Sequence, residues 1–179
     1  IIDSNKSAKF LNQNFELIEK ISFDENELIQ AFEEFIKNKN AYAILNVEDS
    51  LLEKLRANPL SKQSLLINAS SQNTHLRSEI CDKNLLHTIA SNAMLYDGLM
   101  QFLVKRDFKD IFLITGTNPK DILISEDIKR AAKKFGANII KEKIWENNTD
   151  IRRKASEEFP VFTQAKDYDV ILLADYFGD

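Results

Sequence analysis

The chain has 179 residues, of which 44% are hydrophobic and 29% are charged, and its 24 basic and 28 acidic residues give a net charge of −4. This composition is that of a globular protein, and no stretch approaches the roughly 20 consecutive apolar residues that a membrane-spanning helix needs. The acidic balance argues against nucleic-acid binding, which requires a basic surface. We therefore expect neither a nucleic-acid partner nor a segment embedded in a membrane.

Cys81 is the only cysteine, which excludes a disulfide within these residues and a cysteine-based zinc site. The sequence opens on Ile1-Ile2-Asp3 without an initiator Met, and it closes at Asp179 directly after a predicted strand. From these two features we expect that both ends are cut and that any signal peptide lies outside the chain.

Helices and strands alternate through the first half of the sequence. The strands expected from short apolar runs or alternation are residues 15–23, 41–47, 65–68 and 84–90. After the first of them, Asp24 or Asn26 starts a helix whose apolar residues repeat at helical spacing. Asn58-Pro59 ends the helix that follows the second strand, because proline cannot continue it.

The run of residues 111–114 is the best candidate for a core strand. It is too short for a buried helix and stops at turn-forming residues, which indicates a parallel strand with helices on both faces. Beyond it, Asn118 can cap a helix, Pro119 suits its first position, and Gly136 suits its end. Because ligands of open α/β sheets bind beyond the carboxyl ends of strands, we expect function near residues 115–121.

The last part of the chain continues the same alternation. Residues 139–145 and 169–175 are predicted strands, and Thr149-Asp150 is predicted to start a helix that Pro160 ends or bends. This succession of strands and helices is typical of βαβ units and predicts an α/β fold with parallel sheets flanked by helices.

The alternation breaks at residues 84–92, where one predicted strand follows another with no helix between them. We interpret this break as a crossing between two lobes. Residues 1–90 would then belong to the first lobe and residues 91–179 to the second.

The common catalytic and nucleotide-binding motifs are absent from the sequence. With four glycines there is neither a G-x-G-x-x-G nor a G-x-x-x-x-G-K-[ST] loop. His75 and His87 lack the spacing of a zinc site, and no serine stands in a Gly-x-Ser-x-Gly elbow. We therefore expect no catalytic residue, no metal and no cofactor, and we predict that the chain is not an enzyme.

Asp175 is the most interesting carboxylate, because it ends an apolar strand and precedes Tyr176. Two roles remain open for it on the sequence alone, ligand contact and loop capping. A different class of protein, a cytoplasmic signalling domain of flavodoxin-like or receiver type, would use Asp175 as a phosphate acceptor.

Several segments of the sequence, taken together and in this order, resemble those of a known family. They are residues 84–89, residues 130–140, Thr149-Asp150 with Arg152-Arg153, and residues 159–175. They resemble substrate-binding proteins of ABC transporters with the type 1 periplasmic binding fold, which include the branched-chain amino acid-binding proteins. Within that family they look most like the subgroup associated with pyrroloquinoline-quinone-dependent alcohol oxidation, and the likeness runs from about Phe10 to the end.

The resemblance implies a bacterial periplasmic protein that holds a small polar molecule in the cleft between two Rossmann-like lobes and delivers it to the membrane subunits of an ABC importer. It implies no catalysis. The later part of the first lobe and the earlier part of the second would be present in this chain.

The resemblance also implies which residues face the ligand. Ser70 and Ser71 stand where amino acid-binding relatives use a loop rich in serine and threonine, and Asp175 and Tyr176 stand where they place an aromatic contact. Asn92 lies near the crossing and completes the predicted set. The loop after residue 114 departs from the pattern, since Thr117-Asn118-Pro119 replaces an aromatic that relatives often have there, which argues against amino acid specificity.

Overall fold

The computed structural model describes residues 2–12, 16–38, 42–145, 158–164 and 166–176. The chain divides into two compact units, which we call unit 1 and unit 2. Unit 1 consists of Ile1–Ser71 and Asp82–Thr88, and unit 2 of Gln72–Cys81 and Ile89–Asp179. The described strands form two separate three-stranded parallel sheets, with strand orders β1-β2-β3 and β5-β4-β6. The predicted α/β class with parallel sheets flanked by helices is confirmed.

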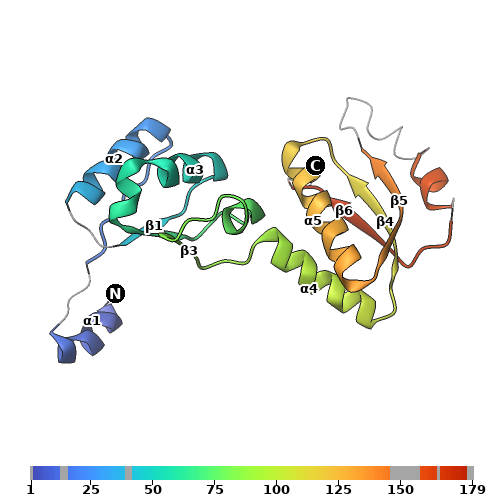
Figure 1. Ribbon diagram of the computed structural model, residues 1–179, viewed down its shortest axis with the longest axis horizontal. Helices are drawn as coiled ribbons and strands as arrows, with labels where there is room; N and C mark the ends of the chain where they lie inside the picture. Colours follow the sequence, from blue (N-terminus) through green and yellow to red (C-terminus); the bar gives the residue numbers. More distant parts are fainter. Residues whose placement is uncertain (1, 13–15, 39–41, 146–157, 165, 177–179) are drawn as a thin grey trace. The chain divides into compact units, whose positions relative to one another are not determined.

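Unit 1 contains the first of these sheets. Its elements are α1 (Ile2–Ala8), η1 (Lys9–Leu11), α2 (Glu25–Lys37), β1 (Tyr42–Leu45), α3 (Asp49–Ala57), η2 (Pro59–Gln63), β2 (Leu65–Asn68) and β3 (Leu85–His87). Helices α2 and α3 lie on the same side of the strands (Figure 1). Ala43, Leu66 and Leu85 form one row across the three strands and are buried, as are Leu52 and Leu55 of α3.

The opposite face of this sheet is open. The next row across the strands is Ile44, Ile67 and Leu86, and its outer members are 66% and 49% exposed. Tyr42, two residues before Ile44 and therefore on the same face, is 62% exposed. An apolar sheet face thus meets solvent in unit 1.

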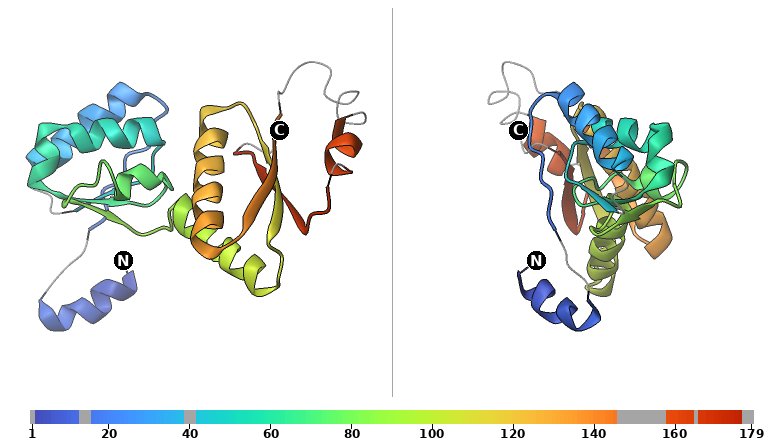
Figure 2. Two further views of the ribbon diagram at one scale, coloured as in Figure 1. Left: turned by 45° about the vertical axis from the view of Figure 1, so that its right-hand side comes forward. Right: turned by 90° about the vertical axis from the view of Figure 1, so that its left-hand side faces the viewer.

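Unit 2 contains the second sheet. Its elements are η3 (Thr74–Arg77), α4 (Asn92–Lys105), β4 (Asp110–Thr115), α5 (Pro119–Phe135), β5 (Asn138–Ile144) and β6 (Val170–Ala174), together with a helical segment at residues 158–163. The central strand β4 is buried on both faces. Ile111 and Leu113 pack with α4 and α5, whereas Phe112 and Ile114 pack with Phe162. Figure 2 shows α5 on one side of the sheet and the helix of residues 158–163 on the other.

The helix ends of unit 2 follow the local signals in the sequence. The side chain of Asn118 accepts a hydrogen bond from the backbone N–H of Lys120 and forms a capping box with Asp121, and Pro119 begins the helix. Gly136 ends it with a φ of 78°, in the left-handed region that glycine adopts without strain. Ser91 caps α4 by accepting from the backbone N–H of Met94. The predicted roles of Asn118, Pro119 and Gly136 are confirmed.

The predicted strand at residues 15–23 is wrong. The described part of this segment, residues 16–23, contains no strand, and its apolar side chains lie in solvent, with Leu17 64% and Phe23 106% exposed. Alternation predicts which residues could face a core, but a strand forms only where a neighbouring strand completes its hydrogen bonds. Among the described residues, no strand pairs with this segment.

Two further predictions concern the chain after β5. The start of the helix at Thr149-Asp150 lies outside the described residues. Pro160 lies inside the described helical segment of residues 158–163 and does not end it, and its carbonyl accepts a hydrogen bond from the backbone N–H of Gln164 at 3.0 Å. The alternative, that Pro160 bends a helix starting at Thr149-Asp150, stays a prediction.

The short segment Gln72–Cys81 packs with unit 2, although the predicted division at residue 90 assigns it to the first lobe. The Thr74 hydroxyl donates to Asp127 Oδ2 at 2.8 Å and accepts from the backbone N–H of Ala93 at 3.1 Å. The division of the lobes at residue 90 stays a prediction.

Candidate functional site

A pocket of about 360 Å³ opens at the carboxyl edge of the β5-β4-β6 sheet in unit 2. Its lining comes from the loop after β4, the start of α5, the ends of β5 and β6, and the helical segment of residues 158–163. The lining residues are Ile114, Gly116, Thr117, Asn118, Asp121, Trp145, Phe159, Leu173, Ala174 and Asp175. The sequence predicted function near residues 115–121, and this loop forms one wall of the pocket.

Backbone hydrogen bonds hold the three strand ends together around the pocket. The N–H of Gly116 donates to the carbonyl of Ala174 at 3.0 Å, and the N–H of Trp145 donates to the carbonyl of Thr115 at 2.8 Å. The parallel ladders therefore extend one residue past the strands. This places Thr117, Trp145 and Asp175 at one edge of the sheet.

Asp121 links the loop after β4 to the loop after β6 by hydrogen bonds. Its carboxylate is buried, with Oδ2 accepting from the backbone N–H of Asn118 at 3.1 Å and Oδ1 accepting from the backbone N–H of Tyr176 at 2.8 Å. A Cβ at Gly116 would lie 2.2 Å from Asp121 Oδ2, so only glycine lets this carboxylate approach. One side chain therefore satisfies two backbone N–H groups that belong to different loops.

Two aromatic rings form the apolar wall of the pocket. The ring centroids of Trp145 and Phe159 lie 5.5 Å apart at an interplanar angle of 56°. Both rings are partly buried and pack against the buried cluster of Phe112, Ile114 and Phe162. Among the described residues, the polar part of the lining consists of Thr117, Asn118 and the carboxylates of Asp121 and Asp175.

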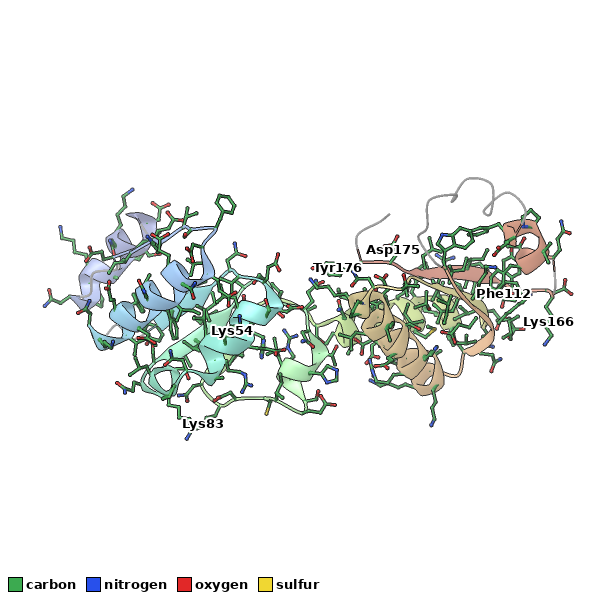
Figure 3. The ribbon with its side chains drawn as sticks, turned by 90° about the horizontal axis from the view of Figure 1, so that it is seen from above. Lys54, Lys83, Phe112, Lys166, Asp175 and Tyr176 are labelled. Atoms are coloured by element: carbon green, nitrogen blue, oxygen red, sulfur yellow. The ribbon has the colours of Figure 1, made fainter. Side chains whose placement is uncertain are left out.

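Of the predicted site residues, Asp175 lines the pocket and is exposed. Tyr176 follows it and is 46% exposed, with the ammonium of Lys120 4.1 Å from the centre of its ring. Figure 3 shows Asp175 and Tyr176 together at the end of β6, away from Phe112 in the core. The lining residues of the described pocket include Asp175 but not Tyr176.

Ser70 and Ser71 lie in unit 1, in the loop after β2, where a buried asparagine organises them. Asn68 is 0% exposed, and its Oδ1 accepts from the backbone N–H groups of Ser70 at 3.1 Å and Ser71 at 2.8 Å. Its Nδ2 donates to the carbonyl of Ser71 at 2.7 Å and lies 3.0 Å from His87 Nδ1. The Ser70 hydroxyl donates to the carbonyl of Val47 at 2.6 Å and accepts from its N–H at 3.0 Å, while Ser71 is 3% exposed. The loop is therefore held by its own polar groups.

Asn92 begins α4 in unit 2, directly after the capping residue Ser91. Its backbone N–H donates to the carbonyl of Gln72 at 2.9 Å. The prediction that Ser70, Ser71, Asn92, Asp175 and Tyr176 face one cleft stays a prediction.

Sequence reasoning missed two kinds of residue. Trp145 follows β5 as Asp175 follows β6, so the rule that selected one strand end would have selected the other. Phe159 sits on the helix of residues 158–163, where no strand-end signal marks it. Among the residues that the structure describes, no group of three or more His, Cys, Asp or Glu side chains could hold a metal ion, and no helix could cross a membrane.

Comparison with known proteins gives a fold rather than a family. No family model matches the chain, and no curated protein matches it. An ABC transporter substrate-binding protein from Desulfitobacterium hafniense superimposes with a TM-score of 0.77 at 11% identity, covering 97% of this chain and 51% of its own. A branched-chain amino acid ABC transporter periplasmic ligand-binding protein from Burkholderia xenovorans gives 0.69 at 13% identity over 87% and 44% of the two chains.

An ABC transporter solute-binding protein from R. palustris, solved in complex with benzoate, gives a TM-score of 0.57 at 10% identity over 84% of this chain and 41% of its own. The chain therefore spans about half of the length of these structures, or somewhat less. It has the fold of type 1 periplasmic binding protein lobes.

Proposed function

We propose that this chain is the solute-binding part of an ABC importer, a periplasmic protein that holds a small polar molecule and performs no chemistry. The observation that carries the proposal is the pocket of about 360 Å³ at the carboxyl edge of the unit 2 sheet, in a chain whose fold is that of substrate-binding proteins. Pockets of about 300–1,000 Å³ are the usual size for small-molecule sites, and open α/β sheets bind ligands at this edge.

Such a protein would have two lobes, of which the first comprises residues 1–90 and the second residues 91–179. Ser70 and Ser71 from the first and Asn92, Asp175 and Tyr176 from the second would face the ligand. The sequence segments that resemble the bacterial subgroup associated with alcohol oxidation support membership of that subgroup. The membrane subunits of the importer would be the partner that receives the ligand.

Ligand-induced thermal stabilisation tests the proposal. A protein that binds a solute in its folded state gains stability in proportion to the logarithm of ligand concentration, so a screen of amino acids, small carboxylates, amines and alcohols should raise the melting temperature with at least one compound. Calorimetry on Asp175→Ala, Tyr176→Ala and Ser70→Ala should then show binding weakened roughly ten- to a hundredfold where a hydrogen bond to a charged ligand group is lost.

Two results would contradict the proposal. Wild-type affinity in all three variants would mean that the residues are misassigned. Incorporation of phosphate at Asp175 from a small phosphoryl donor would favour a receiver-type signalling domain, although the two separate sheets support a lobed protein over a single-sheet receiver.

A further inference from the structure

One short segment belongs to a different unit from the strands on either side of it. Gln72–Cys81 lies between β2 and β3 in the sequence, and both of these strands belong to unit 1, but the segment belongs to unit 2. The chain therefore passes between the units after residues 71, 81 and 88. If the segment left unit 2, the first two of these passages would disappear.

This segment is held together by its own hydrogen bonds. The side chain of Asn73 accepts from the N–H of His75 at 3.0 Å and caps η3. The Ser78 hydroxyl donates to the carbonyl of Thr74, and the N–H of Ile80 donates to the carbonyl of His75, both at 3.1 Å. An element with its own hydrogen bonds can leave the surface on which it packs as one piece, without unfolding of the whole protein.

Thr74 joins the segment to two helices of unit 2. Its hydroxyl donates to Asp127 Oδ2 on α5 at 2.8 Å and accepts from the N–H of Ala93 at the start of α4 at 3.1 Å. Asp127 is 9% exposed, so its bond to Thr74 is shielded from water. Because the acceptor is a carboxylate, this bond belongs to the stronger class of hydrogen bonds.

Two further hydrogen bonds connect the segment to residues 89–92. The carbonyl of Gln72 accepts from the N–H of Asn92 at 2.9 Å, and the guanidinium of Arg77 donates to the carbonyl of Ile89. The Nη1 atom of Arg77 is buried and finds no hydrogen-bond partner among the described residues. Burying a donor without an acceptor costs free energy, which offsets part of the gain from docking.

We infer that Gln72–Cys81 is a clip that docks on unit 2, that it is released while unit 2 stays folded, and that the Thr74 hydroxyl holds it closed through Asp127. While it is docked, the clip adds two chain connections between the units to the one after residue 88. Its release leaves one connection and so gives the units more freedom to move. This device goes beyond the proposed solute-binding function, because it needs no solute.

Trypsin measures the state of the clip, because Arg77 lies within it. The protease must take the arginine side chain into its own pocket, and in the docked clip this side chain is partly buried and bonded to the carbonyl of Ile89. The rate of cleavage after Arg77 in brief digests of the 179-residue chain therefore follows the released fraction. Mass spectrometry of the fragments identifies the cut.

Thr74→Val should speed this cleavage roughly ten- to a hundredfold, the effect expected when a hydrogen bond to a charged group is lost. Thr74→Ser keeps the hydroxyl and should be cleaved at nearly the wild-type rate. Thr115→Val is the matched control, since Thr115 is also buried in unit 2 but its hydroxyl has no partner among the described residues. This control should leave the rate unchanged.

Asp127→Ala removes the same hydrogen bond from the side of α5 and should also speed cleavage after Arg77. Because both variants lose one shared bond, Thr74→Val should add little in the Asp127→Ala background. Effects that add in full would overturn the role given to Asp127.

The connection between the units is tested by nitrogen-15 relaxation. In a variant that carries both Thr74→Val and Arg77→Ala, the rotational correlation times of units 1 and 2 should differ more than in the wild type. The same difference in both proteins would overturn the role of the clip as a connection.

Three results of the digests would overturn the clip itself. The first is a wild-type cleavage rate in both Thr74→Val and Asp127→Ala. The second is cleavage of Thr74→Ser as fast as that of Thr74→Val. The third is an equal acceleration after Lys133, an exposed residue within α5, because unit 2 as a whole would then be opening. Faster cleavage after Arg77 without faster cleavage after Lys133 supports the inference.

Discussion

The two sheets of this protein are built from similar strands but are covered differently. In unit 2, neighbouring side chains of β4 are both buried, with Ile111 and Phe112 each 0% exposed and packed into clusters on opposite faces. In unit 1, Ala43 of β1 is 8% exposed, whereas its neighbour Ile44 is 66% exposed. The apolar sequence of a strand does not show whether one or both of its faces are covered, because the covering helices come from other parts of the chain.

The loops at the carboxyl edges of the two sheets are also held in different ways. In unit 1 the anchor is Asn68, which belongs to the strand itself and binds the N–H groups of the two residues that follow. In unit 2 the anchor is Asp121, which comes from the helix and joins the loop after β4 to the loop after β6. The unit 1 anchor is local in sequence, and the unit 2 anchor spans 55 residues.

The largest expected difference between the units is in the free energy of unfolding that is lost when an apolar side chain of the sheet is truncated to alanine. Phe112→Ala should lower the free energy of unfolding of unit 2 by about 3–5 kcal/mol, because Phe112 is fully buried. The centroid of its ring lies 4.9 Å from that of Phe162 and 4.5 Å from that of Tyr168. Ile44→Ala on the open face of unit 1 should cost about 0.5 kcal/mol or less. Urea unfolding followed by Trp145 emission for unit 2 and by circular dichroism for the whole chain measures both. A loss of several kcal/mol in Ile44→Ala would show that its face is covered in solution.

The unit 1 anchor should be the next most sensitive position. Asn68→Ala leaves the N–H groups of Ser70 and Ser71 without their acceptor in a buried place, which should cost about 1–3 kcal/mol in the free energy of unfolding. Asn26→Ala, on the exposed surface of α2, is the control and should change this free energy by less than about 0.5 kcal/mol. Equal stability of the two variants in urea would mean that the loop does not depend on Asn68.

Two glycines of unit 2 should respond with opposite signs. Gly116→Ala forces a Cβ against Asp121 and should lower the free energy of unfolding by about 1–2 kcal/mol, as overpacking does. Gly98→Ala lies within α4 with no atom inside 4 Å of the added carbon and should raise it by about 0.5–1 kcal/mol. Thermal melts read by Trp145 emission compare the two, and a stabilising Gly116→Ala would contradict the role given to Asp121.

The smallest expected effect is a dependence on pH. Burial alone would raise the pKa of Asp97, but hydrogen bonds from Lys134 and Arg130 on the facing helix outweigh it and hold the pKa below its usual value of 3.8. A carboxyl with a lowered folded pKa stabilises the fold above its unfolded pKa, and this contribution is lost as the pH falls through the folded pKa.

Unit 2 should therefore lose stability in acid as Asp97 becomes protonated, below a pH of about 3.8. Since both cationic partners are partly exposed, the contribution should stay under about 1 kcal/mol. Unfolding midpoints of the wild type, Asp97→Asn and the control Asp167→Asn between neutral and acid pH measure it. A pH dependence in Asp97→Asn as large as that of the wild type would rule out this carboxyl as the source.

The sequence by itself determined the local features of this protein. The strand at residues 111–114, the cap at Asn118, Pro119 at the helix start and Gly136 at its end were all predicted and are all present. Each depends on the conformational preference of one residue or on a short apolar run, which neighbours in sequence are enough to specify. The α/β class followed from the succession of these elements.

Only the tertiary structure decided what lies across the sheets and around the pocket. Residues 16–23 have the alternation of a strand yet pair with no strand in the described part of the chain, because pairing requires a partner that periodicity does not supply. Trp145 and Asp175 share one pocket because parallel strands bring their carboxyl ends to one edge, and Phe159 joins them from the helix of residues 158–163. Asp121 reads as an ordinary first-turn helix carboxylate, and its second contact, with the backbone of Tyr176, exists only once β4 and β6 lie side by side.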